Sequence, residues 1–306
     1  MAFGRNRGIG RLVIAGVSAG LSMIFCAATA SEVELSEANV DFPALSGPAP
    51  DLSEQVKRTN DKYSLPTYAP SQTYSPFGLA CEVDFTAAKS DAAMVMLSLR
   101  APCQINTALT VQFQGLMFSG TTSNIGTYSV LVPAITPKSE FRLTLAGTEP
   151  VVASVNVPQA GQYTRVAVQW AGNAELQIHA FEFGHLGRKK HVWNGAPQSL
   201  AQATQARGGY IVRLGNSAFP NPFHLEIYNF PSAKVDKSGL VRLHLKARVT
   251  KENCGQAQAA QILQNAPDKA ASVMDISLTM PACDHIGDYL LFKNLLKDLK
   301  ISSNQW

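Results

Sequence analysis

The four cysteines after residue 31 are the residues whose spacing most directly indicates a chemistry. They fall into two pairs, Cys81 with Cys103 and Cys254 with Cys283, and both bracketed segments end in an alternating run stopped by proline. Zinc sites favour C-x₂₋₄-C spacing and redox sites favour C-x-x-C, and neither spacing occurs here. Four cysteines allow three pairings. We expect the local pairing, in which structural disulfides cross-link each of the two similar segments.

Candidate ligand contacts gather between residues 179 and 193. This segment holds His179, His185 and His191 at six-residue intervals, together with Arg188 and Trp193. Six-residue spacing matches no common metal motif, so no metal site is predicted. A basic run beside a tryptophan can bind an anion or stack on a sugar. We treat these five residues as candidate ligand contacts, with solvated loop residues and a core tryptophan as the alternative.

The usual sequence motifs for catalysis and cofactor binding do not occur in the chain. It contains no H-E-x-x-H, Walker loop, dinucleotide fingerprint or calcium loop. Gly16-Val17-Ser18-Ala19-Gly20 matches the G-x-S-x-G nucleophile elbow, but it lies inside a hydrophobic leader. We assign no catalytic residue, no cofactor and no metal. An enzyme whose residues converge only in space stays open as an alternative.

The N-terminus has the three parts of an export signal. Three arginines precede an uncharged, mostly apolar stretch at 12–25, and Ala28-Thr29-Ala30 offers small residues at a cleavage site before Ser31. We predict a signal peptide at residues 1–30 and a periplasmic protein, from which the fifth cysteine is removed with the leader. The alternative is an uncleaved inner-membrane anchor formed by residues 12–28. In either case the body lies outside the cytoplasm, where disulfides can form.

Composition indicates a folded body without a nucleic-acid partner. Of the 306 residues, 46% are hydrophobic and 16% are charged, which suits a buried core. The formal charge of +4 depends on three arginines of the leader, and the rest of the chain holds 23 basic against 22 acidic residues. That balance is too weak to indicate binding to nucleic acid.

The body divides by pattern into three segments. Residues 31–80 are acidic and rich in proline and serine, and we interpret them as a tether. Residues 81–160 contain short alternating runs separated by turn signals, including runs at 109–118 and 127–133, which predicts an antiparallel β-sandwich module. Residues 161–306 continue the β pattern, with a strand run at 223–230, but end differently, which predicts a second β-rich α+β domain. The predicted fold class is therefore mainly β.

Two helices are predicted in the last third of the chain. Asn253 can cap a helix running to Ala266, in which Ala259, Ile262, Leu263 and Ala266 share one side. Between 288 and 300, apolar residues recur at helical spacing, at Phe292, Leu295, Leu296 and Leu299. This second pattern predicts a C-terminal amphipathic helix that packs on the sheet, with a membrane-surface helix as the alternative.

Two resemblances to known families follow from particular phrases. Residues 115–135, with the phrase "GTTSNIGTYSVLVPAI", resemble carboxypeptidase-regulatory-like and Cna-B-like sandwich modules. That resemblance implies a small immunoglobulin-like or transthyretin-like spacer, stalk or binding module. The whole body resembles a family of uncharacterised exported bacterial proteins often labelled "translocase". The phrases that carry it are "SLRAPC" (98–103), "GLMFSG" (115–120), "VQWAGNAELQIHAFEFG" (168–184), "HVW" (191–193) and "LLFKNLLKDLKI" (290–301).

These observations favour a non-enzymatic protein of the cell envelope. We expect a disulfide-containing, β-rich body that binds an envelope protein or a glycan. One alternative is a periplasmic hydrolase whose site is assembled across the two halves of the chain. The other is a membrane-anchored accessory factor of a secretion or translocation complex.

Overall fold

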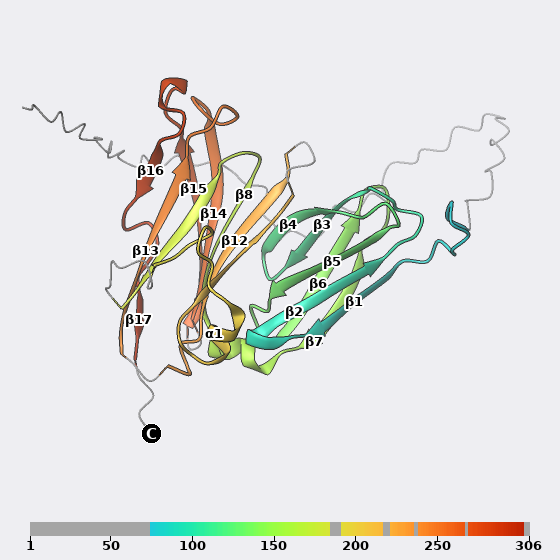
Figure 1. Ribbon diagram of the computed structural model, residues 1–306, viewed down its shortest axis with the longest axis horizontal. Coiled ribbons are helices and arrows are strands. Elements are labelled where there is room, and N and C mark those ends of the chain that lie inside the picture. The colour runs from blue at the N-terminus through green and yellow to red at the C-terminus, as the bar shows by residue number, and fades with distance from the viewer. Residues whose placement is uncertain (1–73, 184–190, 217–220, 236–237, 267–268, 303–306) are drawn as a thin grey trace, which may run out of the picture. The chain divides into compact units, whose positions relative to one another are not determined.

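A computed structural model describes residues 74–183, 191–216, 221–235, 238–266 and 269–302. Of the described residues, 55% lie in strands and 8% in helical turns, so the predicted mainly β fold class is confirmed (Figure 1). The sheets are antiparallel throughout. Among the described residues, no helix has the length and apolar character needed to cross a bilayer.

The N-terminal half folds as a seven-stranded β-sandwich. One sheet has the order β1 (Asp84–Lys89), β2 (Met94–Arg100), β5 (Thr127–Pro133). The other has the order β4 (Leu116–Thr121), β3 (Ala108–Phe113), β6 (Lys138–Leu145), β7 (Val151–Asn156). The order 1-2-5 and 4-3-6-7 is immunoglobulin-like, except that the fourth strand pairs with the third instead of the fifth. A short 3₁₀ turn, η1 (Asp91–Ala93), connects β1 to β2, and a second, η2 (Pro158–Gln162), follows β7.

Alternation and turn chemistry explain these strands. In β6 every second side chain is buried, so the strand presents one face to the core and one to solvent. The run at 109–118, predicted as one strand, is bent into β3 and β4 by Gln114 and Gly115. Both adopt positive φ angles, 42° and 80°, which suit a two-residue hairpin turn.

The C-terminal half contains two further sheets (Figure 1). The first has the order β11 (Tyr210–Leu214), β12 (Phe223–Phe230), β8 (Thr164–Ala171), β14 (Ala257–Ala266), β15 (Lys269–Thr279). The second has the order β10 (His191–Val192), β9 (Leu176–Glu182), β13 (Gly239–Arg248), β16 (Tyr289–Phe292). Strand β17 (Leu299–Ile301) also pairs with β13. The helix α1 (Leu200–Thr204) and the turn η4 (Cys283–His285) complete the described elements.

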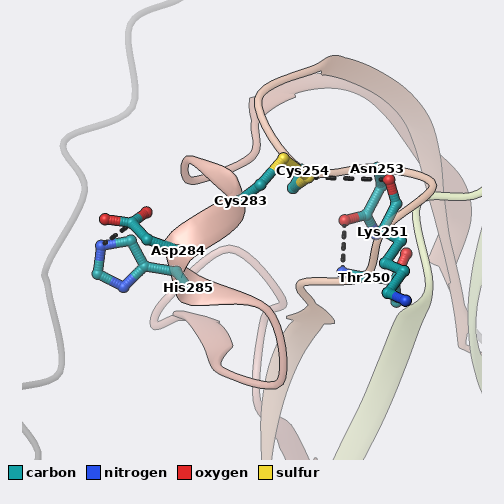
Figure 2. The surroundings of a disulfide bond; sticks show 7 residues. All are labelled: Thr250, Lys251, Asn253, Cys254, Cys283, Asp284 and His285. Carbon is teal, nitrogen blue, oxygen red and sulfur yellow. Dashed lines mark hydrogen bonds and ion pairs between the residues drawn. A yellow bond between two sulfur atoms is a disulfide. The ribbon is translucent and has the colours of Figure 1, made fainter.

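Two disulfides are present, with the local pairing. Cys81 joins Cys103 and Cys254 joins Cys283, with Cα–Cα distances of 5.2 and 5.0 Å. Figure 2 shows the second bond, which ties the turn η4 to the loop before β14. Loops of this length closed by a disulfide gain about 3 kcal/mol through the restricted unfolded chain.

The helix predicted from Asn253 to Ala266 is wrong, because these residues form a loop and the strand β14. Strand β14 is an inner strand of its sheet, between β8 and the edge strand β15. Both of its faces are covered, since Ile262 packs in one apolar core and the next residue, Leu263, packs in the other. A strand buried on both faces loses its alternation, and its apolar positions then imitate helical spacing.

The predicted C-terminal amphipathic helix is also wrong, and with it the α+β description of residues 161–306. The segment forms two short strands, β16 and β17, which pair with β13. Phe292, Leu296 and Leu299 are all buried in the core of the C-terminal half. Phe292 lies on β16, Leu299 lies on β17, and Leu296 lies in the bend between the two strands. The apolar residues are therefore buried as predicted, but by strands and not by a helix. Pairing with the long strand β13 outweighs the helical spacing of the apolar residues in this segment.

Strands of the two halves are joined by side-chain hydrogen bonds. The Gln169 side chain on β8 accepts from the Met117 N–H and donates to the Gly115 carbonyl, at the hairpin between β3 and β4. The Tyr210 hydroxyl donates to the Ala92 carbonyl at 2.8 Å. One apolar core continues from the N-terminal sandwich to β12, where Leu225 and Ile227 are fully buried.

Candidate functional site

The outward face of the sheet β10-β9-β13 carries the residues of greatest chemical interest. Along β9, Ile178 and Ala180 are buried in the apolar core, so the alternate residues His179 and Phe181 stand on the opposite face. Residue pairing places His191 of β10 beside Phe181, and His244 of β13 beside His179. Side chains from three strands therefore meet on one surface.

Five rings form what we call the imidazole–aromatic cluster: His179, Phe181, His191, Trp193 and His244. His179 stacks on Trp193, with 5.2 Å between ring centroids and 13° between ring planes. His191 stacks on Phe181, at 4.3 Å and 11°. His244 lies 5.3 Å from Phe181 in a tilted arrangement. The rings stand side by side across the strands and cover one another's faces.

A hydrogen bond between two imidazoles fixes part of the cluster. His179 Nδ1 and His191 Nε2 are 2.8 Å apart. The second nitrogen of His179, Nε2, is buried without a hydrogen-bond partner among the described residues. A buried N–H without a partner is rarer than a buried acceptor without one. We therefore infer that His179 carries its proton on Nδ1 and donates to His191, which leaves the His191 proton on Nδ1.

The three histidines of the cluster are held neutral at physiological pH. Burial, with the nearby Lys246 ammonium and the other two imidazoles, lowers the pKa of His179 to about 3. Burial and Lys246 also lower the pKa of His191. Burial lowers the pKa of His244 as well, with Lys246 and Arg242 acting in the same direction and Asp298 opposing them. Neutral imidazoles beside Lys246 and Arg242, with Asp298 as the opposing charge, favour an anion as a further neighbour.

Basic side chains surround the cluster on the same sheet face. Arg242, Lys246, Arg248 and Lys300 occupy outward positions of β13 and β17, and we call this set the basic rim. The Lys246 ammonium also lies 6.0 Å from the centre of the Tyr289 ring. Among the described residues, the recorded ion pairs include no member of the basic rim.

The structure brings together three of the five predicted ligand contacts. His179, His191 and Trp193 belong to the cluster, whereas His185 and Arg188 lie outside the described residues. Sequence reasoning missed Phe181, His244 and Lys246. Phe181 could have been found from the sequence, because it follows His179 by two residues on one strand and so lies on the same face. His244 and Lys246 required the pairing of β13 with β9, which joins residues about 65 apart in sequence.

A second polar cluster is structural. Glu226 on β12 is fully buried; it accepts from the Ile178 N–H at 2.6 Å and from Arg213 Nη1 at 3.1 Å. The two-residue strand β10 pairs only with Ala180 and Phe181, and Glu226 takes the Ile178 N–H farther along the same strand. Burial raises the pKa of Glu226 to about 7, against the lowering effect of that N–H and of Arg213.

The described residues contain no group of three His, Cys, Asp or Glu side chains arranged to hold a metal ion. No protein-family model and no curated protein matches the chain. The fold and the site define a structural class: a mainly β protein with two disulfides that presents stacked rings and cations on one sheet face.

Proposed function

We propose that this protein is an exported, disulfide-containing component of the cell envelope that acts as a binding protein. Its contact surface is the imidazole–aromatic cluster. One observation carries the proposal: His179, His191 and Trp193, chosen from sequence as ligand contacts, meet Phe181 and His244 at stacking distance. Binding surfaces are enriched in half-buried aromatic side chains, because these give a large contact area at little cost in conformational entropy.

The exposure of the cluster supports a contact role. His179 is 4% exposed, but Phe181, His191, Trp193 and His244 are only partly covered. These rings lie on the outward face, apart from the apolar core behind the sheet. The buried His179 anchors the set, and the four rings around it keep surface that a ligand can cover.

The proposal is tested by binding of the mature protein to isolated cell envelopes of the producing cell. Co-sedimentation of the wild type is compared with that of the double variant Phe181→Ala/Trp193→Ala. We expect the double variant to bind at least about tenfold more weakly, as loss of two contact rings implies. A double variant with unchanged co-sedimentation would exclude the cluster as the contact surface.

A matched control removes two exposed apolar side chains elsewhere, in Phe77→Ala/Ile125→Ala. These side chains are 59% and 51% exposed and belong to the N-terminal half. The control should bind as the wild type does. If the first double variant fails to fold, as judged by circular dichroism, the milder His191→Gln replaces it, with a smaller loss of binding expected.

A further inference from the structure

The face that carries the imidazole–aromatic cluster has a net positive charge. One carboxylate lies near it, because Asp298, just before β17, accepts from the Leu243 N–H and acts to raise the pKa of His244. The outward positions of β9, β10, β13, β16 and β17 include the four cations of the basic rim and no carboxylate. The acidic residue on these strands, Glu182, points the other way and bonds to the Tyr228 hydroxyl and the Gly209 N–H. Four cations against one nearby carboxylate leave a positive potential over this face.

The stacked rings add to this preference. An aromatic ring is negative on its face and positive at its edge. Because the rings of the cluster cover one another's faces, their exposed parts are mainly edges. His191 also keeps an Nδ1–H that is not used in its bond to His179. Ring edges, this N–H and the cations of the basic rim all favour negatively charged groups.

The proposed contact surface is the face of a sheet and not its edge. This difference limits which kind of polymer can bind to it. Backbone groups of β9 and β13 are paired with each other over seven residue pairs. An acidic peptide that binds as an added strand needs free backbone groups at an edge. On this face a ligand meets side chains alone. A sugar polymer suits such a face, because its hydroxyls and carboxylates can bond to the cations and to the imidazole N–H.

We propose that this face binds an anionic polysaccharide, with Arg242 and Lys246 pairing with the acidic groups of sugars and His191 donating to them. This inference rests on the proposed binding function and names its ligand class. Arg242, His244, Lys246 and Arg248 occupy every second position of β13 and form a row along the strand. A linear polymer lying along β13 meets these side chains in turn.

The test uses the mature protein and three polymers: polygalacturonate, neutral dextran and polyglutamate. We expect binding to polygalacturonate, no measurable binding to dextran, and at least about tenfold weaker binding to polyglutamate. Affinity for polygalacturonate should fall by at least about tenfold between 0.05 and 0.5 M salt, because salt screens exposed charges. Equal binding to polyglutamate would overturn the sugar assignment in favour of an acidic peptide.

A charge-matched pair of variants locates the site. Arg242→Gln/Lys246→Gln should weaken polygalacturonate binding at least tenfold, because both cations belong to the basic rim. Lys138→Gln/Arg142→Gln removes two exposed cations of β6 in the other half, and it should stay within about twofold of the wild type. If both variants lost affinity for polygalacturonate equally, binding would depend on net charge alone, and the proposal would be overturned.

The two proposals can fail separately. If no polymer binds, while envelope co-sedimentation is lost in Phe181→Ala/Trp193→Ala and kept in its control, the anionic ligand is wrong and the binding function stands. If envelope co-sedimentation is unaffected by that variant, the proposed function fails and the ligand assignment fails with it.

Discussion

At the scale of single residues, the cluster buries a histidine in its neutral form. His179 illustrates this, because its neighbours on the sheet face are rings and a lysine instead of a carboxylate. An imidazole in that environment loses more by becoming charged than it would in water. The cluster is therefore a stack of neutral rings, and its polarity comes from the cations around it.

His179 leads to a prediction about acid stability. Its pKa of about 3 in the folded protein lies below the unfolded value of 6.5, so the unfolded chain takes up a proton first. The stabilising effect is present above pH 6.5 and is lost as pH falls toward 3. We expect the wild type to lose about 3 kcal/mol more than His179→Phe between pH 7 and pH 4. Urea unfolding at both pH values measures this, and equal losses would contradict it.

The contribution of Glu226 to stability is expected to depend on pH in the opposite direction. Its folded pKa of about 7 lies above the unfolded value of 4.5, so its stabilising effect is present at low pH and is lost as pH rises through 7. Glu226→Gln imitates the protonated carboxyl. Its stability relative to the wild type should therefore improve by about 2 kcal/mol from pH 5 to pH 8. Exposed Glu140→Gln is the control, and a pH-independent difference for Glu226→Gln would contradict the assignment.

At the scale of elements, the amino-acid pattern predicted strands well where one face meets solvent. The strands at 127–133 and 223–230 have the predicted bounds. Alternation failed for β14, whose two faces meet different cores, and for β16 and β17, which are too short to show a period. Short β10 had no strand signal, yet it brings His191 and Trp193 to the cluster. The site was predictable only in part, because His244 joins it through strand pairing.

The loop before β14 has a physical basis that the helix prediction missed. Asn253 is fully buried, and its Oδ1 accepts from the Thr250 N–H at 2.8 Å (Figure 2). Its Nδ2 donates to the Asn173 and Arg248 carbonyls. An asparagine side chain that bonds to nearby backbone groups competes with helix formation. Here it closes a turn next to the disulfide.

This geometry predicts that Asn253→Ala is strongly destabilising. The substitution removes three hydrogen bonds and leaves two carbonyls and one N–H without partners. We expect a loss of about 3 kcal/mol in the free energy of unfolding. The exposed Asn156→Ala at the end of β7 should change it by less than about 0.5 kcal/mol. Equal effects of the two variants in urea unfolding would contradict the role given to Asn253.

At the scale of the whole molecule, the disulfides connect the fold to the route by which the chain reaches its compartment. Each half contains one bond, and each bond closes a loop of similar size, with sequence separations of 22 and 29 residues. Such bonds persist in oxidising compartments and are rare in the cytosol. The leader predicted at residues 1–30 would deliver the chain to the periplasm, where both bonds can form.

Export and oxidation therefore give one joint prediction for the mature protein. We expect its sequence to begin at Ser31 and its denatured form to show no reactive thiol. Cys254→Ser/Cys283→Ser should lower the free energy of unfolding by about 3 kcal/mol, because it frees a loop in the unfolded chain. Cys26→Ser is the matched control: it lies in the predicted leader, so the mature protein should be unchanged. Four reactive thiols in the mature protein would contradict oxidation, and a start at Met1 would contradict cleavage.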